Sequence, residues 1–122
     1  MSGNSAQKEW FVIVNPNAGS GKGKKDWRRI SDLLTGANIP FISRFTERRG
    51  QAIEYTDEAI QKGFRHFISV GGDGTLNEVV NGVFAQNKIP AGEITIGMIP
   101  VGTGNDWGRM FGIPTIYEGA VK

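Results

Sequence analysis

A stretch in the middle of the chain combines glycines with polar side chains in a way that suits phosphate binding. It reads Val-Gly-Gly-Asp-Gly-Thr-Leu-Asn-Glu from Val70 to Glu78 and directly follows an apolar run. Glycines allow the backbone to approach an anion closely, and the first turn of a helix offers unpaired N–H groups and a partial positive charge. The spacing therefore predicts a phosphate-binding turn between a strand and a helix.

Asp73 is the candidate catalytic residue of this stretch. A carboxylate beside phosphates is repelled unless a cation lies between the two, which favours a Mg²⁺ ion held directly or through water. A structural alternative stays open, because Asp73 could simply cap the helix or form a turn with Gly74. The sequence does not identify the metal ligands.

Two further glycine-bearing loops, at residues 15–23 and 102–106, also follow apolar runs. The periodicity of apolar residues indicates that strands and helices alternate along the chain. Strands are predicted at residues 10–14, 39–45, 66–70 and 94–99. Helices are predicted around residues 27–36, 51–62 and from the glycine turn to about residue 86. Gly36 and Gly63 are expected to end the first two helices, and Phe84 is expected on the apolar face of the third.

This alternation predicts an α/β fold, a three-layer arrangement with a mostly parallel sheet and helices on both faces. The three glycine-bearing loops then lie at the carboxyl edge of the sheet, where open α/β sheets bind ligands. Convergence of three such loops is a stronger signal than any one of them alone.

Composition limits the other possibilities. The chain has 122 residues, a formal net charge of +2 and no cysteine, which fits one domain in a reducing compartment without disulfides or a thiolate metal site. Residues 1–9 are polar and are expected to be flexible, and no apolar run reaches transmembrane length. A cytoplasmic protein is expected, with no nucleic-acid partner.

Two common phosphate-binding motifs are missing. A Walker A motif would need a glycine at Pro16 or Ala18 and Ser or Thr after the lysine. The dinucleotide fingerprint would need a third glycine at Asn77. A hydride-transferring Rossmann enzyme is therefore disfavoured.

Four stretches in order resemble the diacylglycerol kinase catalytic domain family, which includes diacylglycerol, sphingosine, ceramide and bacterial lipid kinases. The stretches are Asn15–Lys22, the loop Thr46–Arg48, Gly71–Gly82 with the sequence GGDGTLNEVVNG, and Ile99–Asp106. The resemblance covers nearly the whole chain after residue 9. Many family members have Gly-His-Ala where this chain has Gly50-Gln51-Ala52, and no role is assigned to that position.

The resemblance implies the NAD kinase/diacylglycerol kinase type of nucleotide-binding lobe over residues 10–122. The cofactor-binding residues that it implies are Asn15, Pro16, Asn17, Ala18, Gly19 and Thr46 near the base and ribose, Gly72, Asp73, Gly74, Thr75, Leu76, Asn77 and Glu78 at the phosphates, and Thr103 in the last turn. Arg48 and Arg49 could contact nucleotide or anionic lipid, or could be solvated loop charges.

The function that the resemblance implies is transfer of the γ-phosphoryl group of ATP to a lipid hydroxyl, with Mg²⁺ as the metal and peripheral contact with the inner membrane face. An NAD kinase-like enzyme and a non-catalytic nucleotide-binding module are the alternatives. Family enzymes are longer and carry a second, β-rich domain. We therefore expect this chain alone to be inactive in phosphoryl transfer and prone to self-association.

Overall fold

The computed structural model describes residues 9–101, which form one parallel sheet with helices on both faces. The elements in order are β1 (Trp10–Val14), α1 (Ala18–Gly36), β2 (Phe41–Phe45), α2 (Gln51–Gln61), β3 (His66–Gly71), α3 (Asp73–Ala85), a 3-10 turn (Ala91–Glu93) and β4 (Thr95–Pro100). The order of strands across the sheet is β2-β1-β3-β4, and every pair is parallel. These elements confirm the predicted α/β class.

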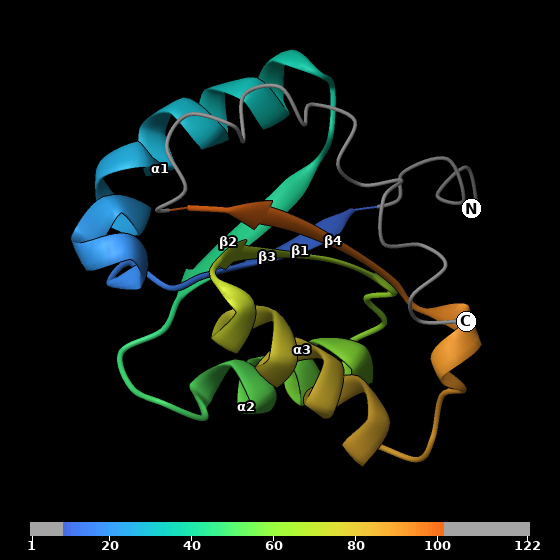
Figure 1. The fold of residues 1–122 in the computed structure, drawn as a ribbon. Helices are drawn as coiled ribbons and strands as arrows, with labels where there is room; N and C mark the ends of the chain where they lie inside the picture. Colours follow the sequence, from blue (N-terminus) through green and yellow to red (C-terminus); the bar gives the residue numbers. More distant parts are fainter. Residues whose placement is uncertain (1–8, 102–122) are drawn as a thin grey trace.

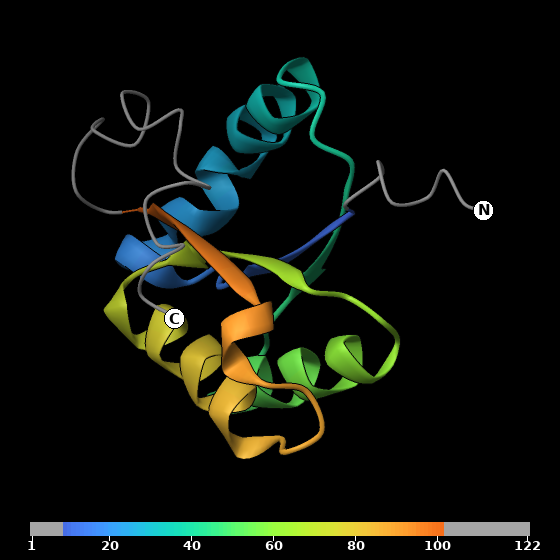
Figure 2. The ribbon, with the colours of Figure 1, turned by 90° about the vertical axis from the view of Figure 1, so that its right-hand side faces the viewer.

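The three layers are visible in Figure 1, where α1 lies above the sheet and α2 and α3 lie below it. The view turned by 90° shows the same separation, with the strands between the two helical layers (Figure 2). The chain crosses one face between β1 and β2 and the other face in its two later crossovers. The crossover direction therefore reverses between β1 and β3, the neighbouring strands at the centre of the sheet.

The central strands are apolar on both sides because both faces of the sheet are covered. In β1, Phe11 and Ile13 belong to the core cluster under α2 and α3, whereas Val12 and Val14 belong to the cluster under α1. All four side chains are buried. The sheet is thus held from both faces, and its carboxyl edge has a fixed position relative to the helices.

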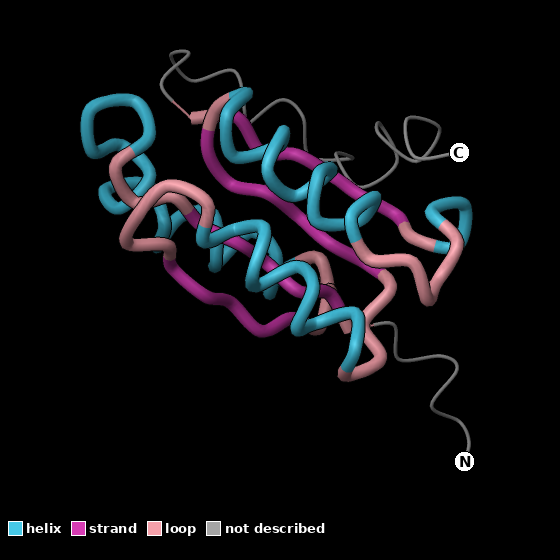
Figure 3. The backbone as a smooth tube through the Cα atoms, turned by 90° about the horizontal axis from the view of Figure 1, so that it is seen from below, coloured by secondary structure: helices cyan, strands magenta, loops and turns pink. Residues whose placement is uncertain are grey.

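Helices α2 and α3 lie side by side across the sheet, as seen from below in Figure 3. Gly82 of α3 makes this close approach possible, because a Cβ atom there would lie 2.7 Å from Cβ of Thr56 in α2. Thr56 is fully buried and donates its hydroxyl to the Ala52 carbonyl oxygen at 2.8 Å. The two helices therefore form one closely packed layer.

The sequence predicted the end of α1 correctly but placed its start too late. The predicted loop at residues 15–23 is shorter, because α1 begins at Ala18. Gly19 and Gly21 adopt left-handed φ angles of 62° and 94°, and Lys24 N–H donates to the Pro16 carbonyl oxygen at 3.1 Å, so the glycines lie within irregular first turns of the helix. The helix ends at Gly36 as predicted, and the left-handed residue after its end is Asn38, with φ 62°.

The stop of α2 is at the predicted residue. Gly63 has a φ of 107°, and Phe64 N–H donates to the Ala59 carbonyl oxygen at 3.0 Å, the bond that closes a Schellman motif. The prediction for α3 was wrong at Phe84, which is 61% exposed, because Val79 and Val83 form the centre of the buried stripe. Within residues 9–101, no helix is long and apolar enough to cross a membrane.

Candidate functional site

A cavity of about 410 Å³ opens at the carboxyl edge of the sheet, beside the point where the crossover direction reverses. Its size falls in the range of small-molecule sites, roughly 300–1,000 Å³. Residues from the loops after β1, β2 and β3 line it, namely Asn15, Asn17, Ala18, Gly19, Thr46, Glu47, Arg48, Arg49, Ala52, Gly72, Gly74, Thr75 and Glu78. Segments far apart in the sequence thus converge as predicted, apart from the loop at 102–106, which lies outside the described residues.

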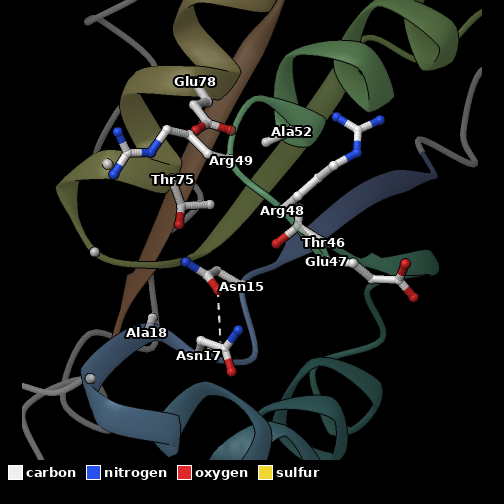
Figure 4. A pocket seen from close by; sticks show the side chains of 13 residues that line it. Asn15, Asn17, Ala18, Thr46, Glu47, Arg48, Arg49, Ala52, Thr75 and Glu78 are labelled. Atoms are coloured by element: carbon white, nitrogen blue, oxygen red, sulfur yellow. Dashed lines mark hydrogen bonds between the residues drawn. The ribbon is translucent and has the colours of Figure 1, made fainter.

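The wall after β1 is set by tight backbone contacts. Asn15 N–H continues the sheet pairing by donating to the Val70 carbonyl oxygen at 2.9 Å, and Asn15 Oδ1 accepts the backbone N–H of Asn17 at 3.0 Å (Figure 4). Gly23 packs directly on this turn, since a Cβ atom there would lie 2.2 Å from the Asn15 carbonyl oxygen. The position of Asn15 therefore depends on a residue in α1 that does not line the cavity.

The wall after β3 is the glycine turn that opens α3. A Cβ atom on Gly71 would lie 2.4 Å from Oγ1 of Thr75, so Gly71 lets that side chain pack under the turn. Cβ atoms on Gly72 and Gly74 would meet nothing within 4 Å, although both residues line the cavity. These two glycines leave open the volume that side chains would fill beside the start of α3.

The loop between β2 and α2 forms the third wall and is held by hydrogen bonds. Thr46 N–H donates to the Val14 carbonyl oxygen at 2.9 Å, and Glu47 N–H donates to Oε1 of Gln51 at 2.6 Å. Gln51, which had no predicted role, thus fixes the loop. Arg48 makes a two-pronged ion pair with Glu54, at 3.3 and 3.2 Å.

A tight turn ends this loop. Gly50 has φ 87° and ψ −14°, the values of the third position of a type II turn, and Gln51 N–H donates to the Arg48 carbonyl oxygen at 3.3 Å. Glycine suits this position because other residues rarely adopt a left-handed φ angle. Gly50 N–H donates to Oε2 of Glu78 at 3.0 Å, so a carboxylate of α3 holds the start of α2.

The two arginines of the loop differ in their contacts. Figure 4 shows Arg48 extending away from α3, where Glu54 pairs with it, while Arg49 extends toward α3. Within residues 9–101, Arg49 makes no ion pair. Its guanidinium group is therefore the lining cation that remains available to an anionic ligand.

Most of the predicted site residues come together. Those that line the cavity are Asn15, Asn17, Ala18, Gly19, Thr46, Gly72, Gly74, Thr75 and Glu78. Pro16, Asp73, Leu76 and Asn77 do not, and the Leu76 side chain instead packs against the core. Thr103 lies outside the described residues.

Asp73 is the first residue of α3 and is exposed. The helix has no side-chain cap hydrogen bond, so the alternative that Asp73 caps α3 finds no support in these contacts. Its carboxylate makes no hydrogen bond within residues 9–101, and Asp73 lies between Gly72 and Gly74, which both line the cavity.

Glu47 and Ala52 line the cavity without a predicted role, and Arg48 and Arg49, for which ligand contact and a solvated loop charge were both open, line it as well. Their nearness to Thr46 in the sequence could have indicated these four residues, since all of them lie within the same loop or the first turn of α2. No group of three or more His, Cys, Asp or Glu residues in the part of the chain that is described could hold a metal ion.

Comparison with known proteins identifies the family of the chain. The sequence profile of the family described as "Diacylglycerol kinase catalytic domain" matches residues 9–122. The chain belongs to this family. Within the diacylglycerol kinase family, a diacylglycerol kinase of Staphylococcus haemolyticus (strain JCSC1435) is 37% identical over 110 residues, and one of Bacillus subtilis (strain 168) is 38% identical over 103 residues.

These alignments cover 90% and 84% of this chain but 32% and 33% of the relatives, so the chain spans about a third of their length. The fold is similar to a crystal structure of a diacylglycerol kinase from Bacillus anthracis str. Sterne, with a TM-score of 0.64 and 31% identity. That comparison covers 94% of this chain and 38% of the solved one. Sequence and structure thus agree on both the family and the fold of this chain.

Proposed function

We propose that residues 10–122 form the ATP-binding lobe of a lipid kinase that transfers the γ-phosphoryl group of ATP to a lipid hydroxyl. The observation that carries the proposal is the open volume at Gly72 and Gly74 beside the start of α3, which we call the cradle. Arg49 lines the same cavity. Family membership supports the same function. Transfer to diacylglycerol is the variant that the names of the relatives favour.

The cavity suits a nucleotide phosphate chain for two reasons. Gly72 and Gly74 carry no side chains, so the backbone is open at these two residues, and the N–H groups of a helix start favour an anion. Arg49 adds a guanidinium group that matches phosphate oxygens. Asn15, Asn17 and Thr46 also line the cavity, and we assign them to the base and ribose.

We propose Mg²⁺ as the metal, and we assign the carboxylate of Asp73 to hold it. Mg²⁺ usually keeps several waters and binds through one or two carboxylates together with substrate phosphates, so a cluster of three protein ligands is not required. The ion would neutralise phosphate charge during transfer. The residues of this chain would contribute positioning, since phosphoryl transfer depends mainly on alignment and charge stabilisation.

We further propose that this chain alone transfers phosphate slowly. In-line transfer requires that the acceptor hydroxyl be held against the γ-phosphate and that water be kept away. The walls of the described cavity all belong to one sheet edge. We also propose that the chain contacts the membrane surface and associates with itself. The exposed apolar side chains of Leu33, Ile42 and Phe45 support self-association.

The first test is a nucleotide titration followed by backbone amide chemical shifts. Mg²⁺–ATP should perturb Asn17, Thr46, Gly72 and Gly74, and Gly72→Ala should weaken binding by about tenfold because its methyl group occupies the cradle. Gly36→Ala is the matched control, since nothing lies within 4 Å of that position either, but it is outside the cavity. Shifts confined to the amino edge of the sheet would refute the placement, and tighter binding of NAD than of ATP would favour the NAD kinase alternative.

The second test concerns the charge of Asp73. If a cation lies between Asp73 and the phosphates, Asp73→Asn weakens binding of Mg²⁺–ATP and strengthens binding of ATP without metal, because repulsion disappears. A change of the same sign in both titrations would contradict the metal role.

The third test measures transfer itself, with labelled ATP and mixed diacylglycerol, sphingosine and ceramide micelles. A full-length curated relative is assayed beside this chain, which should turn over far more slowly because its cavity does not hold an acceptor in line. Comparable turnover would overturn the proposal of slow transfer.

A further inference from the structure

Among the described residues, one side-chain hydrogen bond joins the loop between β2 and α2 to α3. The loop between β2 and α2 is fixed at its beginning to β1, through Thr46 and Val14, and along its length to α2, through Gln51 and Glu54. Toward α3, the bond from Gly50 N–H to Oε2 of Glu78 is the one hydrogen bond that the loop makes within residues 9–101. Glu78 thus ties the end of the loop to α3, in addition to the packing of α2 on α3 at Thr56 and Gly82.

We propose that Glu78 is a positioning residue that holds the turn at Gly50 against α3 and so sets the place of Arg49 at the cavity. The proposal rests on the proposed function, since it assigns Arg49 to nucleotide phosphate. It differs from the role that the resemblance implies for Glu78, which is direct contact with the phosphates. Here Glu78 acts through the neighbouring turn.

The local geometry explains why a carboxylate is useful at this position. Gly50 is the residue that precedes α2, and it carries no side chain that could cap the helix. A carboxylate that accepts an N–H group at a helix start forms a charge-assisted hydrogen bond and lies at the positive end of the helix dipole. Glu78 of α3 therefore supplies from another element the acceptor that α2 lacks.

The alternative, direct contact with phosphate, is disfavoured by charge and by occupancy. A carboxylate repels phosphate oxygens, and one oxygen of Glu78 already accepts the Gly50 N–H. Arg49 is adjacent to Gly50 in the turn, so movement of the turn carries the Arg49 backbone with it. Release of Glu78 should therefore displace the phosphate-binding cation and leave the cradle at Gly72 and Gly74 in place.

The test compares two substitutions of Glu78 in this chain. Glu78→Gln keeps an acceptor oxygen for Gly50 N–H and removes the charge, whereas Glu78→Ala removes both. Glu47→Ala is the matched control, because Glu47 is a carboxylate that lines the same cavity and its side chain makes no hydrogen bond within residues 9–101. Hydrogen exchange of the Gly50 amide is measured without ligand, and affinity for Mg²⁺–ATP is measured by titration.

Glu78→Ala should speed exchange of the Gly50 amide by about tenfold or more, as expected when a hydrogen bond to a charged group is lost, and should weaken nucleotide binding about tenfold. Glu78→Gln should retain most of the protection and most of the affinity, and Glu47→Ala should leave the Gly50 amide protected. The proposal is overturned if Glu78→Ala leaves exchange unchanged. It is equally overturned if Glu78→Gln binds nucleotide as weakly as Glu78→Ala while Gly50 stays protected, since the charge would then act on the ligand itself.

The two measurements separate this proposal from the function on which it rests. Exchange at Gly50 reports the contact in the absence of any nucleotide. If the parent chain does not bind Mg²⁺–ATP, the proposed function fails, and the contact with Glu78 is still judged by exchange. If the parent binds and Glu78→Ala binds equally well, the positioning role fails and the proposed function stands.

Discussion

The cavity has walls of two kinds, and the difference lies in what holds them. The walls after β1 and β3 are fixed by close packing at glycines, with Gly23 against the Asn15 backbone carbonyl and Gly71 against the Thr75 side chain. The wall after β2 begins with a backbone hydrogen bond from Thr46 to Val14, and polar side chains fix the rest of it, with Gln51, Glu54 and Glu78 each bonded to part of the loop.

This difference predicts two kinds of sensitivity. A close contact at a glycine leaves no room for an added methyl group, least of all at Gly23, where the neighbouring atoms are backbone and cannot rotate away. A loop held by exposed hydrogen bonds loses them one at a time, and each contributes little to stability. Substitution should therefore damage the fold at the first two walls and mainly change ligand affinity at the third.

The largest effect is expected at Gly23, where a Cβ atom would lie 2.2 Å from a backbone oxygen. Gly23→Ala should lower the free energy of unfolding by about 3 kcal/mol, as overpacking against backbone does. Urea denaturation measures the change. Gly36→Ala in the same helix is the control and should be neutral or stabilise by about 0.5–1 kcal/mol, because nothing lies nearby. Equal effects of the two substitutions would remove the distinction between the walls.

A smaller effect is expected at Gly50, which belongs to the third wall but has a left-handed φ of 87°. Gly50→Ala should destabilise by about 1–2 kcal/mol, the strain of a Cβ atom in that region. Gly50→Asn should destabilise less, because asparagine tolerates the conformation better. Thermal unfolding compares the two variants, and an alanine variant as stable as the parent would show that the turn can rearrange.

The two arginines sharpen the comparison within the third wall. Arg49→Ala should weaken Mg²⁺–ATP binding about threefold to tenfold, because its guanidinium is available to phosphate. Arg48→Ala removes the same charge from the same loop, but its guanidinium is paired with Glu54, so a smaller loss is expected. Calorimetric titration at low and high salt measures both. A larger loss of affinity for Arg48→Ala than for Arg49→Ala would assign the phosphate contact to Arg48 instead.

The smallest effect is expected from the ion pair between Arg48 and Glu54, whose side chains are 60% and 54% exposed. A double-mutant cycle should give a coupling of about 0.5 kcal/mol or less, as for other exposed pairs. The pair between Arg44 and Glu58 should couple similarly, although Arg44 also stacks on Tyr55 at 4.0 Å. A coupling above about 2 kcal/mol would mean that this wall is as rigid as the other two.

The sequence was sufficient for the fold because each element carries its own pattern. The apolar runs of β1 and β3 and the stripe at Val79 and Val83 reflect burial on a covered sheet. The start of α1 was not predictable from local preference, since glycines ordinarily favour loops. Tertiary contact decides there, because Gly23 packs on the turn at Asn15.

For the site, the sequence was informative about backbone and weak on side chains. A glycine turn between a strand and a helix places its own residues, so Gly72 and Gly74 could be found from spacing. The sequence could not show that Glu78 bonds to Gly50, because the two residues are 28 positions apart and the bond forms only after α2 and α3 pack together. The different pairing of Arg48 and Arg49 likewise depends on where α2 places Glu54.

The strand order also constrains how the chain folds. β1 is synthesised before the other strands, but its neighbours in the sheet are β2 and β3, and Val14 pairs with Val70 far along the sequence. Loop-closure entropy opposes such distant pairing, so parallel sheets of this kind assemble slowly compared with helical bundles. During synthesis, one edge of the apolar strand β1 therefore stays unpaired until β3 emerges. The sheet edge that carries the cavity is completed at the same step that covers this exposed strand edge.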